Sequence, residues 1–206
     1  MIMFRETNSR DAVASKLPYL PWWVWPALVS SSMLILLGNR LIGDPDTLWH
    51  IAVGNWIINY QTVPTSDTFS FTMHGEPWMS TSWLSQVVLS LTYRALGWLG
   101  PVIASALSVS LTLGFLARFL THKVGTASAL IFTMATFSLL MPHLLARPHV
   151  LAMPCSVAFT CGVINAADRS DRPSYWLLPL LTLWANLHAS FVVGLALNVG
   201  KGLYAD

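Results

Sequence analysis

The sequence predicts an all-α protein: a polytopic membrane helix bundle with about five transmembrane helices and two interfacial amphipathic helices in its first outer loop. Composition is the first reason, because 54% of the 206 residues are hydrophobic and 10% are charged, whereas soluble domains carry about 25% charge. The second reason is that apolar residues gather in runs of roughly 20, the length that crosses a bilayer core. The third is that polar residues concentrate in one long segment, residues 43–98.

Five apolar runs predict the membrane spans. They cover residues 20–42, 99–120, 124–141, 149–167 and 174–200. The residues before the first run, 1–19, are largely polar and are not followed by the cleavage pattern of a signal peptide. We therefore expect a cytoplasmic segment at 1–19 and a transmembrane domain over 20–206.

The basic residues predict the orientation, because cytoplasmic loops are enriched in Lys and Arg. With the N-terminus inside, the inner segments hold Arg5, Arg10, Lys16, Arg118, Lys123, Arg169 and Arg172. The outer segments then hold only Arg40, Arg94, Arg147 and Lys201. We expect a multi-pass protein of the bacterial inner membrane with its N-terminus in the cytoplasm and loop 43–98 on the outer face. The scattered basic residues give no indication of nucleic-acid binding.

Two helices are predicted in the outer loop. The first covers 47–60, where apolar residues recur with helical spacing at Trp49, Ala52, Val53, Trp56, Ile57 and Tyr60. Its expected N-cap is Asp46, with Pro45 keeping Asp44 outside the helix. The second starts after Ser82 and ends at Gly97, with an apolar face of Leu84, Val87, Val88, Leu91 and Ala95. Between them, alternation over 68–72 predicts a short strand, and His74-Gly75 predicts a turn.

Carboxylates concentrate in the same loop, which holds Asp44, Asp46, Asp67 and Glu76 of only nine in the chain. Asp44 and Asp46 lie just beyond a span, where they can ligate a divalent cation or act as a general base. The structural alternative is that Asp46 caps the helix and Asp44 is a solvated loop acid. His50, one turn further on, can orient Asp46, bind metal or contact phosphate, or simply be hydrogen-bonded.

Other polar residues have comparable alternatives. Asp67 can bind substrate or cap a turn. Arg147, beside His149 at a later outer junction, suits a lipid phosphate, or its side chain can extend to the lipid headgroups. His188 lies inside the last apolar run, where it can line a substrate cavity or make a bond between helices.

The order of these pieces resembles the first outer loop of bacterial membrane proteins of the GT-C glycosyltransferase superfamily. The matching pieces are Asp44-x-Asp46-x-x-Trp49-His50, Gly54-Asn55-Trp56-Ile57, Pro64-x-x-Asp67-x-Phe69-Ser70-x-Thr72, Gly75-x-Pro77-Trp78 and Trp83-Leu84-Ser85-Gln86. Two later patches are similar as well, Arg147-Pro148-His149 and Trp184-x-Asn186-x-His188. Together they span about residues 40–192.

The resemblance implies a GT-C-like domain that moves a sugar from a polyprenyl-phosphate carrier to an acceptor on the outer face of the membrane. It makes Asp46 the first and Asp44 the second candidate for the catalytic carboxylate, and both are candidate ligands of Mg or Mn. It assigns substrate binding to His50, Asp67, Arg147, His149 and His188.

GT-C enzymes usually have more than five spans, so we expect this domain to be incomplete at its C-terminus and to need a further membrane subunit for activity. The main alternative is a non-catalytic membrane subunit or a truncated remnant of the fold. A small transporter or lipid-binding protein would need polar residues through the inner halves of the spans, where few are present.

Overall fold

The structure is a computed structural model that describes residues 20–170 and 172–203. Within these ranges every regular element is a helix, and a lone β-bridge joins Ser66 to Pro77. The all-α prediction is therefore confirmed for the described part of the chain. The predicted cytoplasmic segment 1–19 lies outside the described residues.

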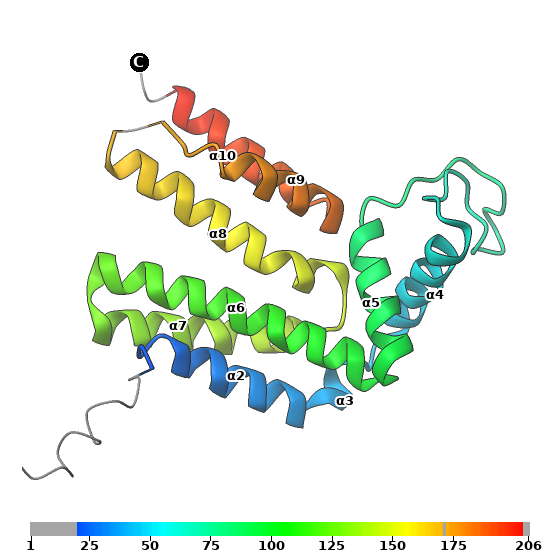
Figure 1. The fold of residues 1–206 in the computed structure, drawn as a ribbon, viewed down its shortest axis with the longest axis horizontal. Helices are drawn as coiled ribbons and strands as arrows, with labels where there is room; N and C mark the ends of the chain where they lie inside the picture. Colours follow the sequence, from blue (N-terminus) through cyan, green and yellow to red (C-terminus); the bar gives the residue numbers. More distant parts are fainter. Residues whose placement is uncertain (1–19, 171, 204–206) are drawn as a thin grey trace, which may run out of the picture.

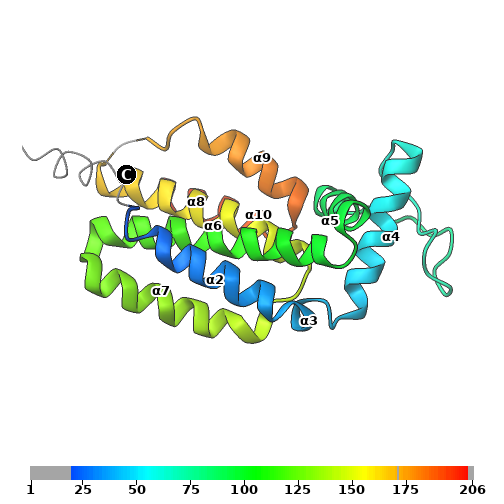
Figure 2. The same cartoon turned by 60° about the horizontal axis from the view of Figure 1, so that its bottom comes forward.

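The bundle is built around one central helix, α6, which contacts helices on several sides (Figure 1). Its neighbours along the bundle are α2, α7 and α8, while α9 and α10 pack on the far side of α8 (Figures 1 and 2). These elements are α2 (Val24–Leu36), α6 (Leu99–Val124), α7 (Thr126–Leu140), α8 (Pro148–Asp168), α9 (Leu177–Leu187) and α10 (Phe191–Leu203). Short helices α3 (Gly38–Leu41) and η2 (Met141–His143) follow α2 and α7.

Among the described residues, three helical segments are long and apolar enough to cross a membrane: Leu99–Val124, Thr126–His143 and Pro148–Asp168. They coincide with the second, third and fourth predicted spans. The first predicted span is an interrupted one, because α2 ends at Leu36 and α3 begins at Gly38. Helices α2 and α9 are apolar but shorter.

The fifth predicted span is wrong as a single helix. Helix α9 ends at Leu187 and α10 begins at Phe191. A Cβ added to Gly194 would lie 2.7 Å from the Trp184 ring, whereas ten residues of continuous helix would separate these positions by about 15 Å. The chain therefore reverses, and α9 and α10 form a hairpin. Helix α9, with 11 residues, is shorter than the roughly 20 residues that a bilayer core requires.

Both predicted outer-loop helices are present, as α4 (Pro45–Tyr60) and α5 (Trp83–Leu96), and they lie together at one end of the bundle (Figure 1). Their buried faces differ from the predicted stripes. Helix α5 buries Ser85, Gln86, Leu89 and Ser90, while the predicted apolar face is half-buried or exposed. In α4, Val53 and Ile57 of the predicted stripe are buried, as are Ile51 and Gly54 outside it, whereas Ala52 and Tyr60 are exposed.

Helices surrounded by lipid are expected to bury small polar residues and to expose apolar ones. The reason is that an apolar side chain gains no free energy by moving from lipid into the protein interior. The same arrangement recurs in α6. Ser108 donates a hydrogen bond to the Val150 carbonyl of α8 at 2.7 Å, and Ser110 pairs with Ser31 of α2 at 2.6 Å. Hydroxyl groups therefore join helices inside the bundle, while Leu107, Leu111 and Phe115 of α6 remain exposed.

The segment between α4 and α5 is a loop, and the strand predicted at 68–72 is wrong. The loop closes instead at its base, where Trp78 donates to the Thr65 carbonyl at 3.0 Å and Asp67 to that of Glu76 at 2.8 Å. The Asp67 side chain bonds the backbone of the next residues and curls the chain away from an extended course. Gly75 lies in the predicted turn with φ +86°, which confirms the turn.

Gly54 allows the backbones of α4 and α5 to approach each other closely. A Cβ at this position would lie 2.0 Å from the Gln86 carbonyl oxygen, so only glycine fits without moving one helix. Helical Gly114 makes a useful contrast, because its nearest neighbour would be the Ala27 Cβ at 3.7 Å.

We predict that Gly54→Ala lowers the thermal unfolding midpoint in detergent, because overpacking costs about 1–3 kcal/mol and the obstacle is backbone. Gly114→Ala should leave the midpoint unchanged or raise it, since alanine favours a helix by about 1 kcal/mol over glycine. Circular dichroism melts would measure both. Equal midpoints for wild type and Gly54→Ala would show that the α4–α5 contact is looser than described.

Candidate functional site

The site begins where α4 begins. Asp44, not Asp46, is the N-cap: its backbone is extended (φ −118°, ψ 124°) and its Oδ1 accepts from the Asp46 N–H at 3.1 Å. The predicted N-cap was thus two residues late. The reason is Pro45, which occupies the first helical position, where its fixed φ suits the helix and its missing N–H is not needed. Asp46 falls in the first turn, where its carboxylate faces the positive end of the helix dipole.

Arg147 bridges both carboxylates. Its Nε pairs with Asp44 Oδ2, and its Nη2 lies 2.9 Å from Asp46 Oδ2. The Asp44 side chain is buried, at 8% exposure, whereas that of Asp46 is 57% exposed. The hydrogen bond from Arg147 lowers the pKa of Asp44, and the same bond raises that of Arg147. Asp44 is therefore locked as a buried anion, while Asp46 reaches solvent.

The backbone on both sides fixes this ion pair in place. Arg147 precedes Pro148, the first residue of α8, and so has an extended backbone. Just before it, Ala146 donates its N–H to the Leu41 carbonyl at 2.7 Å, and its own carbonyl accepts from the buried Thr47 hydroxyl at 3.3 Å. The junction after η2 is thereby tied to both α3 and α4.

His50 lies one turn along α4 and is held by α5. Gln86, only 1% exposed, has its Nε2 3.3 Å from His50 Nδ1, and Ser80 donates to Gln86 Oε1 at 2.6 Å. With the amide oriented in this way, Gln86 donates to Nδ1, and the imidazole proton is on Nε2. Burial lowers the pKa of His50 to about 4, although the charge of Asp46 opposes the shift. His50 is therefore neutral near pH 7.

His149 and His188 form a second part of the site. Their ring centroids are 6.2 Å apart. Both line a pocket of about 380 Å³ between α8, α9 and α10. His188 lies in the turn of the α9–α10 hairpin rather than inside a span, and its Nδ1 accepts from the Ser190 N–H at 3.1 Å. The first turn of α8 joins the two parts along the chain, because His149 follows Arg147 by two residues.

Asp67 lies apart from the ion pair, in the loop before α5. Its carboxylate accepts from the Phe69 and Ser70 N–H groups at 2.8 and 2.9 Å and from the Ser70 hydroxyl at 2.5 Å. These hydrogen bonds, led by that of the Ser70 hydroxyl, lower the pKa of Asp67. They are the bonds of a turn cap, the structural alternative for this residue.

Two sets of residues at the site were not predicted from the sequence. One is the Ser80–Gln86 pair that holds His50. The other is an aromatic cluster beside α4, in which Phe69 lies 6.1–6.4 Å from the rings of Trp49, Trp56 and Trp78. The pattern that pointed to both was the run of Trp and polar residues in an otherwise apolar chain, but spacing alone did not show which of them meet.

The described residues contain no group of three or more His, Cys, Asp or Glu side chains placed to hold a metal ion. The two aspartates predicted to bind Mg or Mn are both paired with Arg147. They could serve as a pair of oxygen ligands only if the guanidinium moved away. The cation therefore remains a prediction from the resemblance.

We predict that the protein loses stability as the pH falls from about 6.5 to about 4, because unfolded His50 binds a proton over this range and folded His50 does not. His50→Gln should flatten the decline in the thermal midpoint between pH 7.5 and 4.5. The exposed His74 supplies the control, and His74→Gln should follow the wild-type curve. An unchanged slope in His50→Gln would mean that His50 is solvated.

Comparisons with protein-family models, with curated proteins and with solved structures gave no match to this chain.

Proposed function

We propose that the protein is a GT-C-like membrane glycosyltransferase that moves a sugar from a polyprenyl-phosphate carrier to an acceptor on the outer face of the bacterial inner membrane. The single observation that carries the proposal is the pairing of Arg147 with one buried and one exposed carboxylate at the end of an apolar bundle. A carboxylate base and a phosphate-binding cation within one contact are what transfer from a lipid phosphate requires.

The two aspartates differ enough to have different roles. Asp46, 57% exposed, can reach an acceptor hydroxyl and is the proposed general base. The buried side chain of Asp44 forms an ion pair with Arg147 and accepts a hydrogen bond from the Asp46 N–H. Asp44 therefore positions Arg147. Arg147 is 35% exposed and keeps N–H donors beyond the two that these carboxylates use.

In the proposed step the acceptor hydroxyl oxygen forms a bond to the anomeric carbon, and the bond from that carbon to the phosphate oxygen breaks. The electron pair leaves with the polyprenyl phosphate, whose added charge Arg147 stabilises, and the hydroxyl proton goes to Asp46. The neutral His50 can donate a hydrogen bond from Nε2 to substrate oxygen. The pocket lined by His149 and His188 is the proposed binding site for the headgroup of the carrier. Asp67 and its loop are the proposed contacts for the acceptor.

The alternative is a non-catalytic membrane subunit or a remnant of the fold. It is favoured by one observation: Arg147 neutralises both aspartates and, through Ala146, ties α3, α4 and α8 together, which is a sufficient structural role for all three residues. In that case the ion pair serves stability alone.

We predict that Asp46→Asn lowers sugar transfer by about 10²–10⁴-fold, the usual contribution of a general base. Proteoliposomes would carry the protein, with a candidate partner subunit where one is available, and polyprenyl phosphate loaded in turn with radiolabelled glucose, mannose, galactose or N-acetylglucosamine. Release of label from the lipid phase measures transfer. Glu76→Gln, a change of another exposed carboxylate in the same loop, is the matched control.

Asp44→Asn separates the two interpretations. If Asp44 is a positioning residue, Asp44→Asn should lower both the rate of sugar transfer and the thermal midpoint. Asp46→Asn should lower the rate of transfer with little change in the midpoint. Full transfer by Asp46→Asn would exclude it as the base. Loss of stability in both variants, with no transfer by the wild type from any of the four donors, would favour the non-catalytic subunit.

A further inference from the structure

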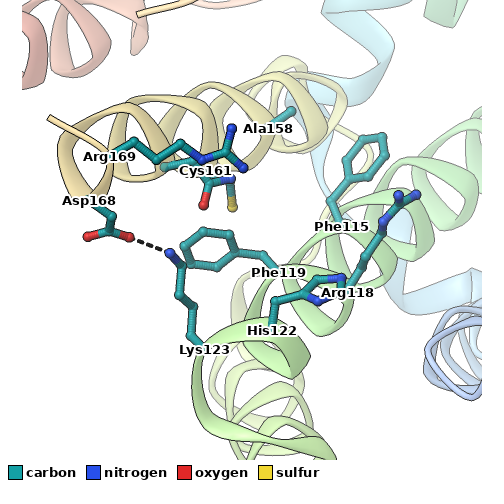
Figure 3. A pocket seen from close by; sticks show the side chains of 10 residues that line it. Phe115, Arg118, Phe119, His122, Lys123, Ala158, Cys161, Asp168 and Arg169 are labelled. Atoms are coloured by element: carbon teal, nitrogen blue, oxygen red, sulfur yellow. Dashed lines mark hydrogen bonds and ion pairs between the residues drawn. The ribbon is translucent and has the colours of Figure 1, made fainter. Parts of the chain in front are cut away.

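A second pocket lies at the end of the bundle opposite α4 and α5. It has a volume of about 550 Å³ and is formed by the last turns of α6 and α8 (Figure 3). Phe115, Arg118 and Phe119 come from α6, while Cys161 and Arg169 come from α8 and its end. None of the proposed transferase residues takes part, so this pocket calls for its own explanation.

Positive charge dominates the pocket. Its lining includes Arg118, Lys123 and Arg169 but a single carboxylate, Asp168, which pairs with Lys123 (Figure 3). Among the described residues neither arginine is within salt-bridge distance of an acid. Within the described part of the chain, two guanidinium groups are thus available to an anion, and guanidinium matches phosphate oxygens in a bidentate fashion.

Arg118 also contacts Trp23, a residue that lines a neighbouring apolar pocket. Its guanidinium carbon lies 5.7 Å from the centre of the Trp23 ring. This apolar pocket has a volume of about 280 Å³, and Trp23 and Phe115 are among its lining residues. It runs between α2 and α6 along Leu111 and Leu107. Phe115 belongs to both pockets. An apolar groove therefore adjoins the basic pocket and follows an exposed row of α6 toward the middle of the bundle.

We propose that these two adjoining pockets bind an anionic phospholipid, with its phosphate between Arg118 and Arg169 and an acyl chain in the groove along α6. A charged head and a long apolar tail are the two features that this pair of pockets complements. Basic pockets between transmembrane helices are suited to phosphate headgroups. The orientation predicted from Lys and Arg puts this end of the bundle on the cytoplasmic side, away from the proposed transfer reaction.

The test uses the whole protein in detergent and native mass spectrometry with added lipid. We expect wild type to retain dioleoyl phosphatidylglycerol over dioleoyl phosphatidylcholine. Arg118→Gln and Arg169→Gln should each lower the retained fraction of phosphatidylglycerol by about fivefold, the effect expected for one basic residue near a lipid headgroup. Arg172→Gln removes the same charge from an exposed position at this end of the bundle that does not line the pocket, and it should change nothing.

Further probes separate a lipid from a free phosphate. Dihexanoyl phosphatidylglycerol, whose chains are too short to fill the groove, should bind more weakly than the dioleoyl lipid, and inorganic phosphate should compete poorly. Equal retention of the two dioleoyl headgroups, an equal effect of Arg172→Gln, or complete displacement by millimolar inorganic phosphate would each overturn the proposal. The wild-type preferences decide the matter even if an arginine variant fails to fold.

Discussion

The guanidinium of Arg147 lies between two carboxylates that precede it by about a hundred residues, and the end of the bundle is organised by this contact. Arg147 begins α8, and Asp44 with Asp46 begins α4, so one side chain joins the start of a long apolar helix to the start of a helix outside the bundle. Removing Arg147 would leave the Asp44 carboxylate, whose side chain is 8% exposed, without its counter-charge, which is costly. The Asp44 cap of α4 and the backbone bonds of Ala146 hold the two ends of this contact in place.

Three of the described helices are long and apolar enough to cross a membrane, and lipid as the surrounding solvent would account for the small polar residues that are buried between helices. Helices in water hide their apolar faces, whereas α5 buries Ser85, Gln86 and Ser90 together with Leu89 and leaves Leu91 exposed. Close approach of the helices then adds to the apolar contacts of the bundle core, which include Val109, Leu113 and Val150. Gly54 against the Gln86 carbonyl and the hydroxyl bonds of α6 supply that approach.

Much of the helical layout could be predicted, because apolar length and helical spacing are local properties of the sequence. The spans at α6, α7 and α8 and the positions of α4 and α5 follow from them. Burial could not be predicted, since apolar spacing identifies a helix but not which of its faces meets protein and which meets lipid. The break at His188 was missed because hydropathy is the same for one helix and for a hairpin. Arg147, His149 and His188 were selected one at a time; their contacts depend on the hairpin turn and on the junction at Ala146, which no local pattern encodes.

The double use of Gln86 has a mechanical consequence. Its carbonyl lies against Gly54, and its side chain orients His50, so the backbone contact and the imidazole are held by the same residue. Sliding α5 along α4 by even one residue would take the amide out of reach of Nδ1 and free the ring to rotate. The direction in which His50 presents its Nε2 proton therefore depends on the register of α4 and α5. A partner that shifts either helix would change the orientation of the His50 ring.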